Sequence, residues 1–231
     1  MSKRKRQKAP LSGSEIARFI DQSLLIPRAT EADIIKLCKT AIKYNFYSVC
    51  VNPYYVPLCN ALLKGHETKV TTVIGFPLGM TVKDAKIYEA KQAVLYGADE
   101  LDIVMNIGAA KSGNWDYVGK ELLEIISATK SALHKVIIET CCLAEEEKIV
   151  ATKVASLFGA KFIKTSTGFG TKGATIKDVK LIKKIVGDRA EVKAAGGIKT
   201  LSQVLQFINA GATRIGTSAG VEIMKEAHSG I

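Results

Sequence analysis

Eight short runs of apolar and β-branched residues recur along the chain after residue 14, and most are separated by enough residues for a helix. An alternation of short strands and helical segments predicts a parallel sheet with helical crossovers, which is an α/β fold. Eight such units in 231 residues favour a single closed (β/α)8 TIM barrel, with an open doubly wound sheet as the alternative. The predicted strands cover residues 18–23, 46–51, 69–75, 100–106, 135–140, 161–166, 190–195 and 213–217.

Four threonines predict where helices begin. A threonine three residues before an acid or amide can cap the first turn, and the later side chain can return a hydrogen bond. No linker, low-complexity stretch or internal repeat follows residue 14, so we expect one barrel domain over 14–231, with a short N-terminal helix, and a tail over 1–13. The four boxes are Thr30-x-x-Asp33, Thr81-x-x-Asp84, Thr175-x-x-Asp178 and Thr200-x-x-Gln203.

The tail is strongly basic. The formal net charge is +11, and five of those charges lie at Lys3, Arg4, Lys5, Arg6 and Lys8. Such a segment is either a disordered, solubilising arm or a patch for nuclear localisation or nucleic acid. No aromatic residue interleaves with the charges, which favours the first interpretation and makes a nucleic-acid partner less expected. The milder basic excess elsewhere fits a small, anionic, phosphorylated substrate.

Cysteine and histidine usage indicates a cytoplasmic protein without a metal or another cofactor. The five cysteines form no regular framework, and adjacent Cys141 and Cys142 would point to opposite faces of a strand, so we expect all five to be reduced core residues. The three histidines are far apart and lack metal-ligand spacing. No apolar run is long enough to span a bilayer, and the basic N-terminus lacks the apolar segment of a signal peptide.

Two lysines lie inside predicted strands. Lys164 and Lys193 each occupy a short apolar run that ends in a glycine-bearing turn. A buried strand normally excludes lysine, so two on neighbouring strands indicate a shared chemical task. A cation beside a lysine can lower its pKa and leave a neutral amine that attacks a carbonyl. Lowering a lysine pKa from about 10.4 to roughly 7 or 8 takes about 3 units, near 4 kcal/mol. A second ammonium about 4 Å away supplies about that much at an effective dielectric constant of about 20.

Asp102 is the third candidate catalytic residue. Because strand side chains alternate, Asp102 faces one way while Leu101, Ile103 and Met105 pack outward against helices. A charged residue near the carboxyl end of a barrel strand is typical of a catalytic group. The alternative is that Asp102 and the two lysines form a buried structural salt bridge.

Glycines form a second cluster at the same predicted end of the barrel. Gly173 follows the sixth strand, Gly196 and Gly197 follow the seventh, and Gly216-x-x-x-Gly220 accompanies the eighth. Glycine lets backbone N–H groups approach a ligand, and TIM barrels often bind phosphate at the loops after strands seven and eight. The cluster therefore predicts a phosphate site.

Several motifs together resemble one enzyme family, deoxyribose-phosphate aldolase. The resemblance runs in order through roughly residues 15–225. The family is a class I, metal-free (β/α)8 aldolase that reversibly cleaves 2-deoxy-D-ribose 5-phosphate to acetaldehyde and D-glyceraldehyde 3-phosphate. The motifs are Asp99-Glu-Leu-Asp-Ile-Val-Met-Asn-Ile-Gly108, Lys135-Val-Ile-Ile-Glu-Thr140, Lys164-Thr-Ser-Thr-Gly-Phe169, Lys193-Ala-Ala-Gly-Gly197 and Arg214-Ile-Gly-Thr-Ser218.

The resemblance implies a role for each candidate residue. Lys164 would form the Schiff base, Lys193 would lower its pKa, and Asp102 would transfer protons through water. Asp21, in the first strand, would support the lysine network. The resemblance also implies a homodimer. The substrate and its phosphate would be held by Thr165, Gly173, Gly196, Gly197, Gly216, Thr217 and Ser218.

The chain departs from the family pattern at a few positions. The first-strand motif often reads Asp-His-Thr and here has Gln22, Ala219 replaces a serine in the eighth-strand loop, and Lys172 stands where glycine is common. Some members end in a helper tyrosine that this sequence lacks. Two alternatives stay open: a Schiff-base barrel aldolase with another donor, and a non-catalytic protein that binds polyanions through its basic tail.

Overall fold

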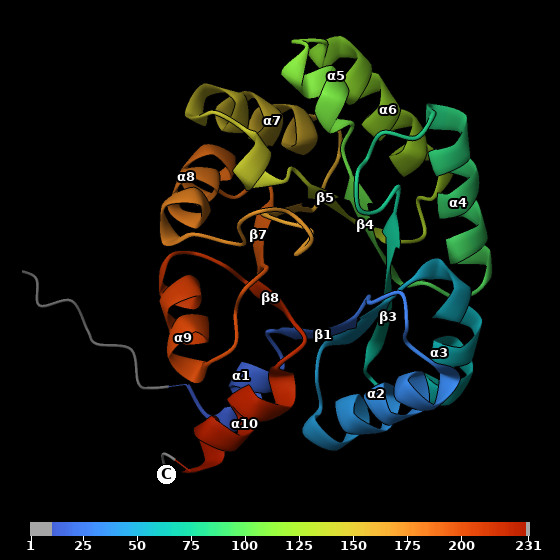
Figure 1. The fold of residues 1–231 in the computed structure, drawn as a ribbon, viewed down its shortest axis with the longest axis vertical. Coiled ribbons are helices and arrows are strands. Elements are labelled where there is room, and N and C mark those ends of the chain that lie inside the picture. Colours follow the sequence, from blue (N-terminus) through green and yellow to red (C-terminus); the bar gives the residue numbers. More distant parts are fainter. Residues whose placement is uncertain (1–10, 230–231) are drawn as a thin grey trace, which may run out of the picture.

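The computed structural model describes residues 11–229 and has one closed barrel of eight parallel strands (Figure 1). The strands are adjacent in sequence order, and the first pairs with the last. The predicted TIM barrel is confirmed, and the open sheet is excluded. The five basic residues of the predicted tail lie outside the described residues. The strands are β1 (Ile20–Leu24), β2 (Ser48–Val51), β3 (Lys69–Ile74), β4 (Glu100–Val104), β5 (Leu133–Ile137), β6 (Phe162–Lys164), β7 (Glu191–Ala195) and β8 (Arg214–Thr217).

Helices surround the barrel (Figure 1). The N-terminal helix α1 packs beside α10, since a Cβ built on Gly13 would lie 3.7 Å from the ring of His228. The helices are α1 (Gly13–Ala17), α2 (Glu31–Tyr44), α3 (Val56–Leu63), α4 (Lys83–Leu95), α5 (Ile107–Lys111), α6 (Trp115–Ala128), α7 (Glu145–Leu157), α8 (Ile176–Val186), α9 (Leu201–Asn209) and α10 (Gly220–Ser229), with the short 3-10 helices η1 (Pro53–Tyr55) and η2 (Thr140–Cys142).

Three of the four predicted helix starts are correct. Thr30 and Thr200 form complete capping boxes, and Thr175 accepts a hydrogen bond from the Asp178 N–H. The prediction at Thr81 is wrong, because α4 begins only after Val82, which has no side-chain cap. This later start puts Asp84 at the second helical position, where it cannot complete a box with Thr81.

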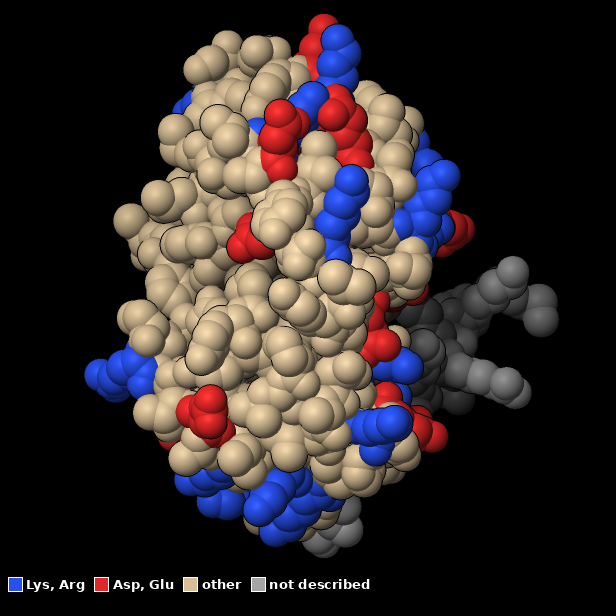
Figure 2. Space-filling model, turned by 90° about the vertical axis from the view of Figure 1, so that its right-hand side faces the viewer, with Lys and Arg blue, Asp and Glu red and all other residues tan. Residues whose placement is uncertain are grey.

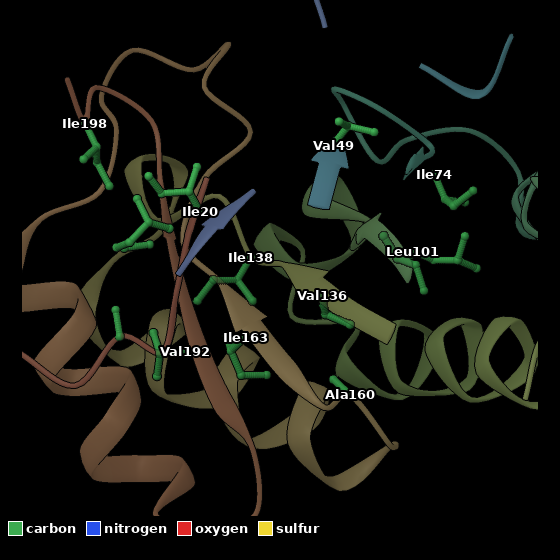
Figure 3. Packing of buried hydrophobic residues seen from close by; sticks show 14 of the residues in the cluster. Ile20, Val49, Ile74, Leu101, Val136, Ile138, Ala160, Ile163, Val192 and Ile198 are labelled. Carbon is green, nitrogen blue, oxygen red and sulfur yellow. The ribbon is translucent and has the colours of Figure 1, made fainter. Parts of the chain in front are cut away.

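The apolar core lies between the barrel and its helices. The outward strand residues Leu101, Val136, Ile163 and Val192 are fully buried in one cluster (Figure 3). Ile103 and Met105 belong to the same cluster, so the outward face predicted for the fourth strand is confirmed. The opposite faces of these strands carry charged side chains into the barrel interior.

The cysteine prediction is partly wrong. Cys38, Cys50 and Cys59 are buried, but Cys141 is half-buried and Cys142 is exposed. β5 ends at Ile137, earlier than predicted, and the two adjacent cysteines lie in η2 rather than on opposite faces of a strand. All five described cysteines are free.

The outer surface near α3 and α4 carries few charges. Figure 2 shows uncharged atoms across the middle of this face and charged side chains toward its edges. Large apolar side chains are exposed here on the β3–α4 loop and on α4, including Leu78, Met80, Val82, Tyr88 and Leu95. Within residues 11–229, none of the helices combines the length and the apolar character that crossing a membrane requires.

Candidate active site

Lys164 and Lys193 lie side by side inside the barrel. Lys164 is the last residue of β6, and it is in register with Lys193 on β7. Both side chains point inward, and they are 3% and 1% exposed, respectively. Two amines are therefore held together where water has little access.

Asp102 joins these lysines. Its Oδ2 accepts hydrogen bonds from the Nζ atoms of Lys164 and Lys193, both at 2.8 Å. Its Oδ1 accepts one from Lys135 at 2.9 Å. The structure thus brings the three predicted catalytic residues together around one fully buried carboxylate.

Asp21 extends the network from β1. It forms salt bridges with Lys193 and with Arg214, the latter at 2.8 Å. The Asp21 side chain is fully buried and sits at the level of Gly216 on the neighbouring strand. It contacts Lys193 rather than Lys164, so any effect of Asp21 on the charge state of Lys164 passes through Lys193 and Asp102.

Sequence reasoning missed three charged members of this network. Lys135 pairs with Glu100 at 2.6 Å, and Arg214 pairs with Glu100 at 3.0 Å. The Arg214 guanidinium also lies 3.4 Å from the ring centroid of Tyr47. Strand alternation could have found Glu100, because it stands two residues before Asp102 and shares its face.

The network fixes the charge of several members. Burial by itself would raise the pKa of Asp102, but three lysines outweigh burial and hold that pKa well below its usual range. Asp21 behaves in the same way, because Lys193 and Arg214 lower its pKa despite burial. Burial would lower the pKa of Lys193, but Asp102 and Asp21 raise it. These two carboxylates therefore favour the protonated form of Lys193.

A cavity of about 340 Å³ opens above Lys164 at the carboxyl end of the strands. This volume lies in the range of small-molecule sites. Asp102 and Lys193 do not line the cavity, so among the predicted catalytic residues Lys164 is the one that reaches it. The predicted binding residues on its wall are Gly196, Gly197, Gly216, Thr217 and Ser218.

Thr165 and Gly173 lie behind this wall. The Thr165 hydroxyl accepts a hydrogen bond from the Ala195 N–H at 3.1 Å and donates one to the Ala195 carbonyl at 3.2 Å. A Cβ on Gly173 would come within 2.1 Å of the Gly196 carbonyl oxygen. Both residues therefore shape the loop after β7 and do not face the cavity.

Other residues that sequence reasoning missed line the cavity. Lys199 brings a cation beside the glycine loops, and Ser23 contributes from the end of β1. Thr167 and Phe169 contribute from the loop after β6. In contrast, Lys172 is exposed and lies outside the cavity wall. The signal for Lys199 was its place two residues after the second glycine of the loop that follows the seventh strand.

The loop after β6 is held by Glu139. This residue has φ 48° and ψ 71°, in the left-handed region that few non-glycine residues adopt. Its buried carboxylate accepts hydrogen bonds from the N–H and the hydroxyl of Thr167. A strained backbone of this kind persists where the surrounding structure enforces it. Here the hydrogen bonds from Thr167 to the Glu139 carboxylate hold a residue of the cavity wall in place.

The chain matches the family described as DeoC/LacD family aldolase over residues 16–226. A deoxyribose-phosphate aldolase of Thermococcus gammatolerans is 55% identical over 221 residues, covering 94% of this chain and 98% of the relative. One from Carboxydothermus hydrogenoformans is 54% identical, covering 95% and 98%. The tetrameric deoxyribose phosphate aldolase of Aeropyrum pernix is 32% identical with a TM-score of 0.89, covering 95% and 94%. This chain belongs to the DeoC/LacD family of aldolases.

Proposed function

We propose that this chain is a deoxyribose-phosphate aldolase that reversibly cleaves 2-deoxy-D-ribose 5-phosphate to acetaldehyde and D-glyceraldehyde 3-phosphate. The observation that carries this proposal is the position of Lys164, which lines the cavity, while Asp102 and Lys193, which share a hydrogen-bonded carboxylate oxygen with it, do not. An amine in such a place can form a Schiff base with an aldehyde. The identity to relatives of this name supports the choice of substrate.

In the proposed reaction, the neutral Lys164 amine attacks C1 of the open-chain sugar phosphate. Loss of water from the carbinolamine gives an imine. The protonated imine accepts the electron pair of the C2–C3 bond as the C3 hydroxyl loses its proton, so glyceraldehyde 3-phosphate leaves and an enamine remains. Protonation of the enamine carbon and hydrolysis release acetaldehyde and regenerate the amine.

Asp102 would manage protons in this sequence. It is fully buried and does not line the cavity, so its exchange with the substrate has to pass through Lys164 or a water molecule. Its low pKa, caused by the three lysines that outweigh burial, keeps it an acceptor that orients the amine. Lys193 stays charged and supports the network from the side away from the cavity.

The phosphate would bind at the glycine loops beside Lys199. Gly196 and Gly197 both have positive φ, at 91° and 78°, which is the backbone region that glycine enters without strain. Such a turn exposes backbone N–H groups to an anion, and Lys199 on the same wall adds charge.

A coupled assay of deoxyribose 5-phosphate cleavage tests the proposal. We expect Lys164→Ala to abolish cleavage, whereas Lys172→Ala, which changes an exposed lysine off the cavity wall, keeps the wild-type rate. Borohydride reduction with acetaldehyde should add a two-carbon mass to Lys164. Equal cleavage by wild type and Lys164→Ala would defeat the proposal.

Two comparisons address the alternatives. Rates with acetaldehyde and with ketone donors separate this activity from that of another Schiff-base aldolase. Deletion of residues 1–10 should leave aldol cleavage unchanged. If deletion removes polyanion binding and the chain shows no aldolase activity, the non-catalytic alternative is the correct one.

We also propose that two copies associate through the apolar face near α4. Exposed apolar residues on one face are typical of an interaction site, and Leu78, Met80, Val82 and Tyr88 lie there. Charged substitutions such as Tyr88→Glu should shift sedimentation toward the monomer. A cytoplasmic location is supported by the free cysteines, and a role in deoxyribonucleotide catabolism follows from the proposed substrate.

A further inference from the structure

The charged residues inside the barrel form a closed ring of alternating sign. Each cation in the ring contacts two carboxylates, and each carboxylate contacts two of these cations. Lys193 contacts Asp21 and Asp102, Lys135 contacts Asp102 and Glu100, and Arg214 contacts Glu100 and Asp21. The six side chains are at most 4% exposed. The ring therefore has three positive and three negative charges and is neutral.

Lys164 is a buried lysine that is not a member of this neutral ring. Its ion pair among the described residues is with Asp102 Oδ2, an oxygen that it shares with Lys193. If Lys164 is protonated, the buried cluster carries one excess positive charge, and an excess charge is costly in an interior. If the Lys164 amine releases its proton, the cluster is neutral.

Lys164 and two members of the ring, Glu100 and Arg214, lie at opposite ends of the barrel. Lys164 is the last residue of β6 and lines the cavity, whereas Glu100 and Arg214 are the first residues of β4 and β8. Neither Glu100 nor Arg214 lines the cavity. They therefore reach the reaction only through the other charges of the ring.

We propose that Arg214 and Glu100 are positioning residues that set the charge balance of the ring, and through it decide that Lys164 is the amine that gives up its proton. The proposal rests on the proposed function for its significance, because a neutral Lys164 is what Schiff-base formation requires. Arg214 makes the net charge of the buried cluster more positive and so favours the neutral form of the Lys164 amine. Glu100 makes that net charge more negative and so favours the protonated form.

The other groups that face Lys164 leave this count unchanged. Asp102 on β4, Lys135 on β5 and Lys193 on β7 are members of the ring. Cys50 on β2 is a neutral thiol at physiological pH, because burial raises its pKa to about 11, with Asp102 contributing. Glu139, two residues after β5, directs its carboxylate to Thr167.

The test measures how readily Lys164 loses its proton, without using the sugar phosphate. Reductive methylation with formaldehyde and cyanoborohydride labels neutral amines, and mass spectrometry gives the rate at Lys164 relative to exposed Lys172 in the same protein. The pH midpoint of that ratio is then compared among Arg214→Met, Glu100→Gln, the double variant and Arg214→Lys.

The charge balance predicts that the two single variants shift the pH midpoint of Lys164 methylation in opposite directions. Arg214→Met removes a cation and should raise the midpoint by about one pH unit, whereas Glu100→Gln removes an anion and should lower it by about one unit. The double variant and Arg214→Lys restore the count and should return to the wild-type midpoint. Equal midpoints in all proteins, or shifts in the same direction for the two single variants, would overturn the proposal.

Two controls separate effects on folding and on function from the effect on the Lys164 midpoint. Circular dichroism reports whether each variant folds, and if Arg214→Met does not, the direction of the Glu100→Gln shift decides alone. A merely structural role would lower activity in both single variants without opposite midpoint shifts. If the midpoints shift as expected while the wild type does not cleave deoxyribose 5-phosphate, the proposed function fails and the charge-balance inference stands.

Discussion

The carboxamide of Gln22 accepts a hydrogen bond from the backbone N–H of Gly220 at 2.9 Å. Its nitrogen donates a second bond to the Ser218 carbonyl at 3.0 Å. Gly220 leaves room for this contact, since a Cβ there would lie 2.3 Å from the Gln22 oxygen. A side chain of β1 therefore holds both sides of the turn between β8 and α10, beside the cavity.

Gln22→Ala should weaken sugar phosphate binding. The variant loses two hydrogen bonds that shape the turn, each contributing about 1 kcal/mol, so we expect KM for deoxyribose 5-phosphate to rise about tenfold or more. The turnover number should change much less, because Lys164 and Asp102 are untouched. Steady-state kinetics check this, with unphosphorylated deoxyribose as the control substrate. A fall in kcat without a change in KM would contradict the assignment.

Lys199→Met should also raise KM for the phosphorylated sugar. Lys199 lines the cavity beside Gly196 and Gly197, and loss of an exposed cation near an anion costs about 1 kcal/mol, or about fivefold. The effect should shrink at high salt, because salt screens exposed charges. Lys172→Met is the matched control and should leave KM unchanged at every salt concentration. Equal effects of both substitutions would argue against a local role for Lys199.

Asp102→Asn should harm both catalysis and stability. The variant leaves three buried lysines without their shared carboxylate, so the free energy of unfolding should fall by about 3 to 5 kcal/mol. Cleavage should slow by about 100-fold or more, since a positioned proton acceptor is lost. Urea unfolding and the coupled assay measure the two effects. Asp116→Asn, on the exposed surface of α6, is the control and should change stability by less than about 0.5 kcal/mol.

His134 should make the fold sensitive to mild acid. Burial on β5 lowers the pKa of His134 to about 4, and its Nε2 lies 2.8 Å from the Thr129 hydroxyl. In the unfolded chain His134 has an ordinary histidine pKa of about 6.5, so between about pH 4 and 6.5 the unfolded chain binds more protons than the folded one. The free energy of unfolding therefore has its full value above about pH 6.5 and decreases as the pH falls toward 4.

The loss should reach up to about 3 kcal/mol for wild type. Unfolding in urea at a series of pH values between 7.5 and 4.5 measures it. His134→Gln retains a polar side chain but has no titrating group, so its stability should fall less over this range. Parallel curves for the two proteins would rule out His134 as the cause.

Much of the fold could be predicted from the sequence, because the chemistry of the strands is local. Alternation within one strand separates Asp102 from Leu101 and Ile103, and the structure has the same division. The helix starts at Thr30 and Thr200 depend on residues three apart and were correct. Thr81 failed because its capping pattern lies in a loop, where a local motif cannot tell when the helix begins.

The charge network required the pairing between strands. Asp102 meets Lys135 because the two residues are in register on β4 and β5, and no pattern within either strand gives that register. The same reason applies to Arg214 and Glu100, which come from strands on different sides of the barrel. Thr165 shows the converse case, since its place in a motif predicted substrate contact while its hydroxyl serves the backbone of Ala195.

The packing of α1 against α10 has a practical consequence. α1 precedes the start of β1, and α10 runs back from the end of β8 to pack beside α1 (Figure 1). Because the cavity lies at the carboxyl ends of the strands, the described chain begins and ends at the opposite side of the barrel. An affinity tag or a surface tether joined at either end therefore leaves the entrance for small molecules clear. Proximity of these ends also makes a circularly permuted variant, opened in an outer loop, a practical engineering format.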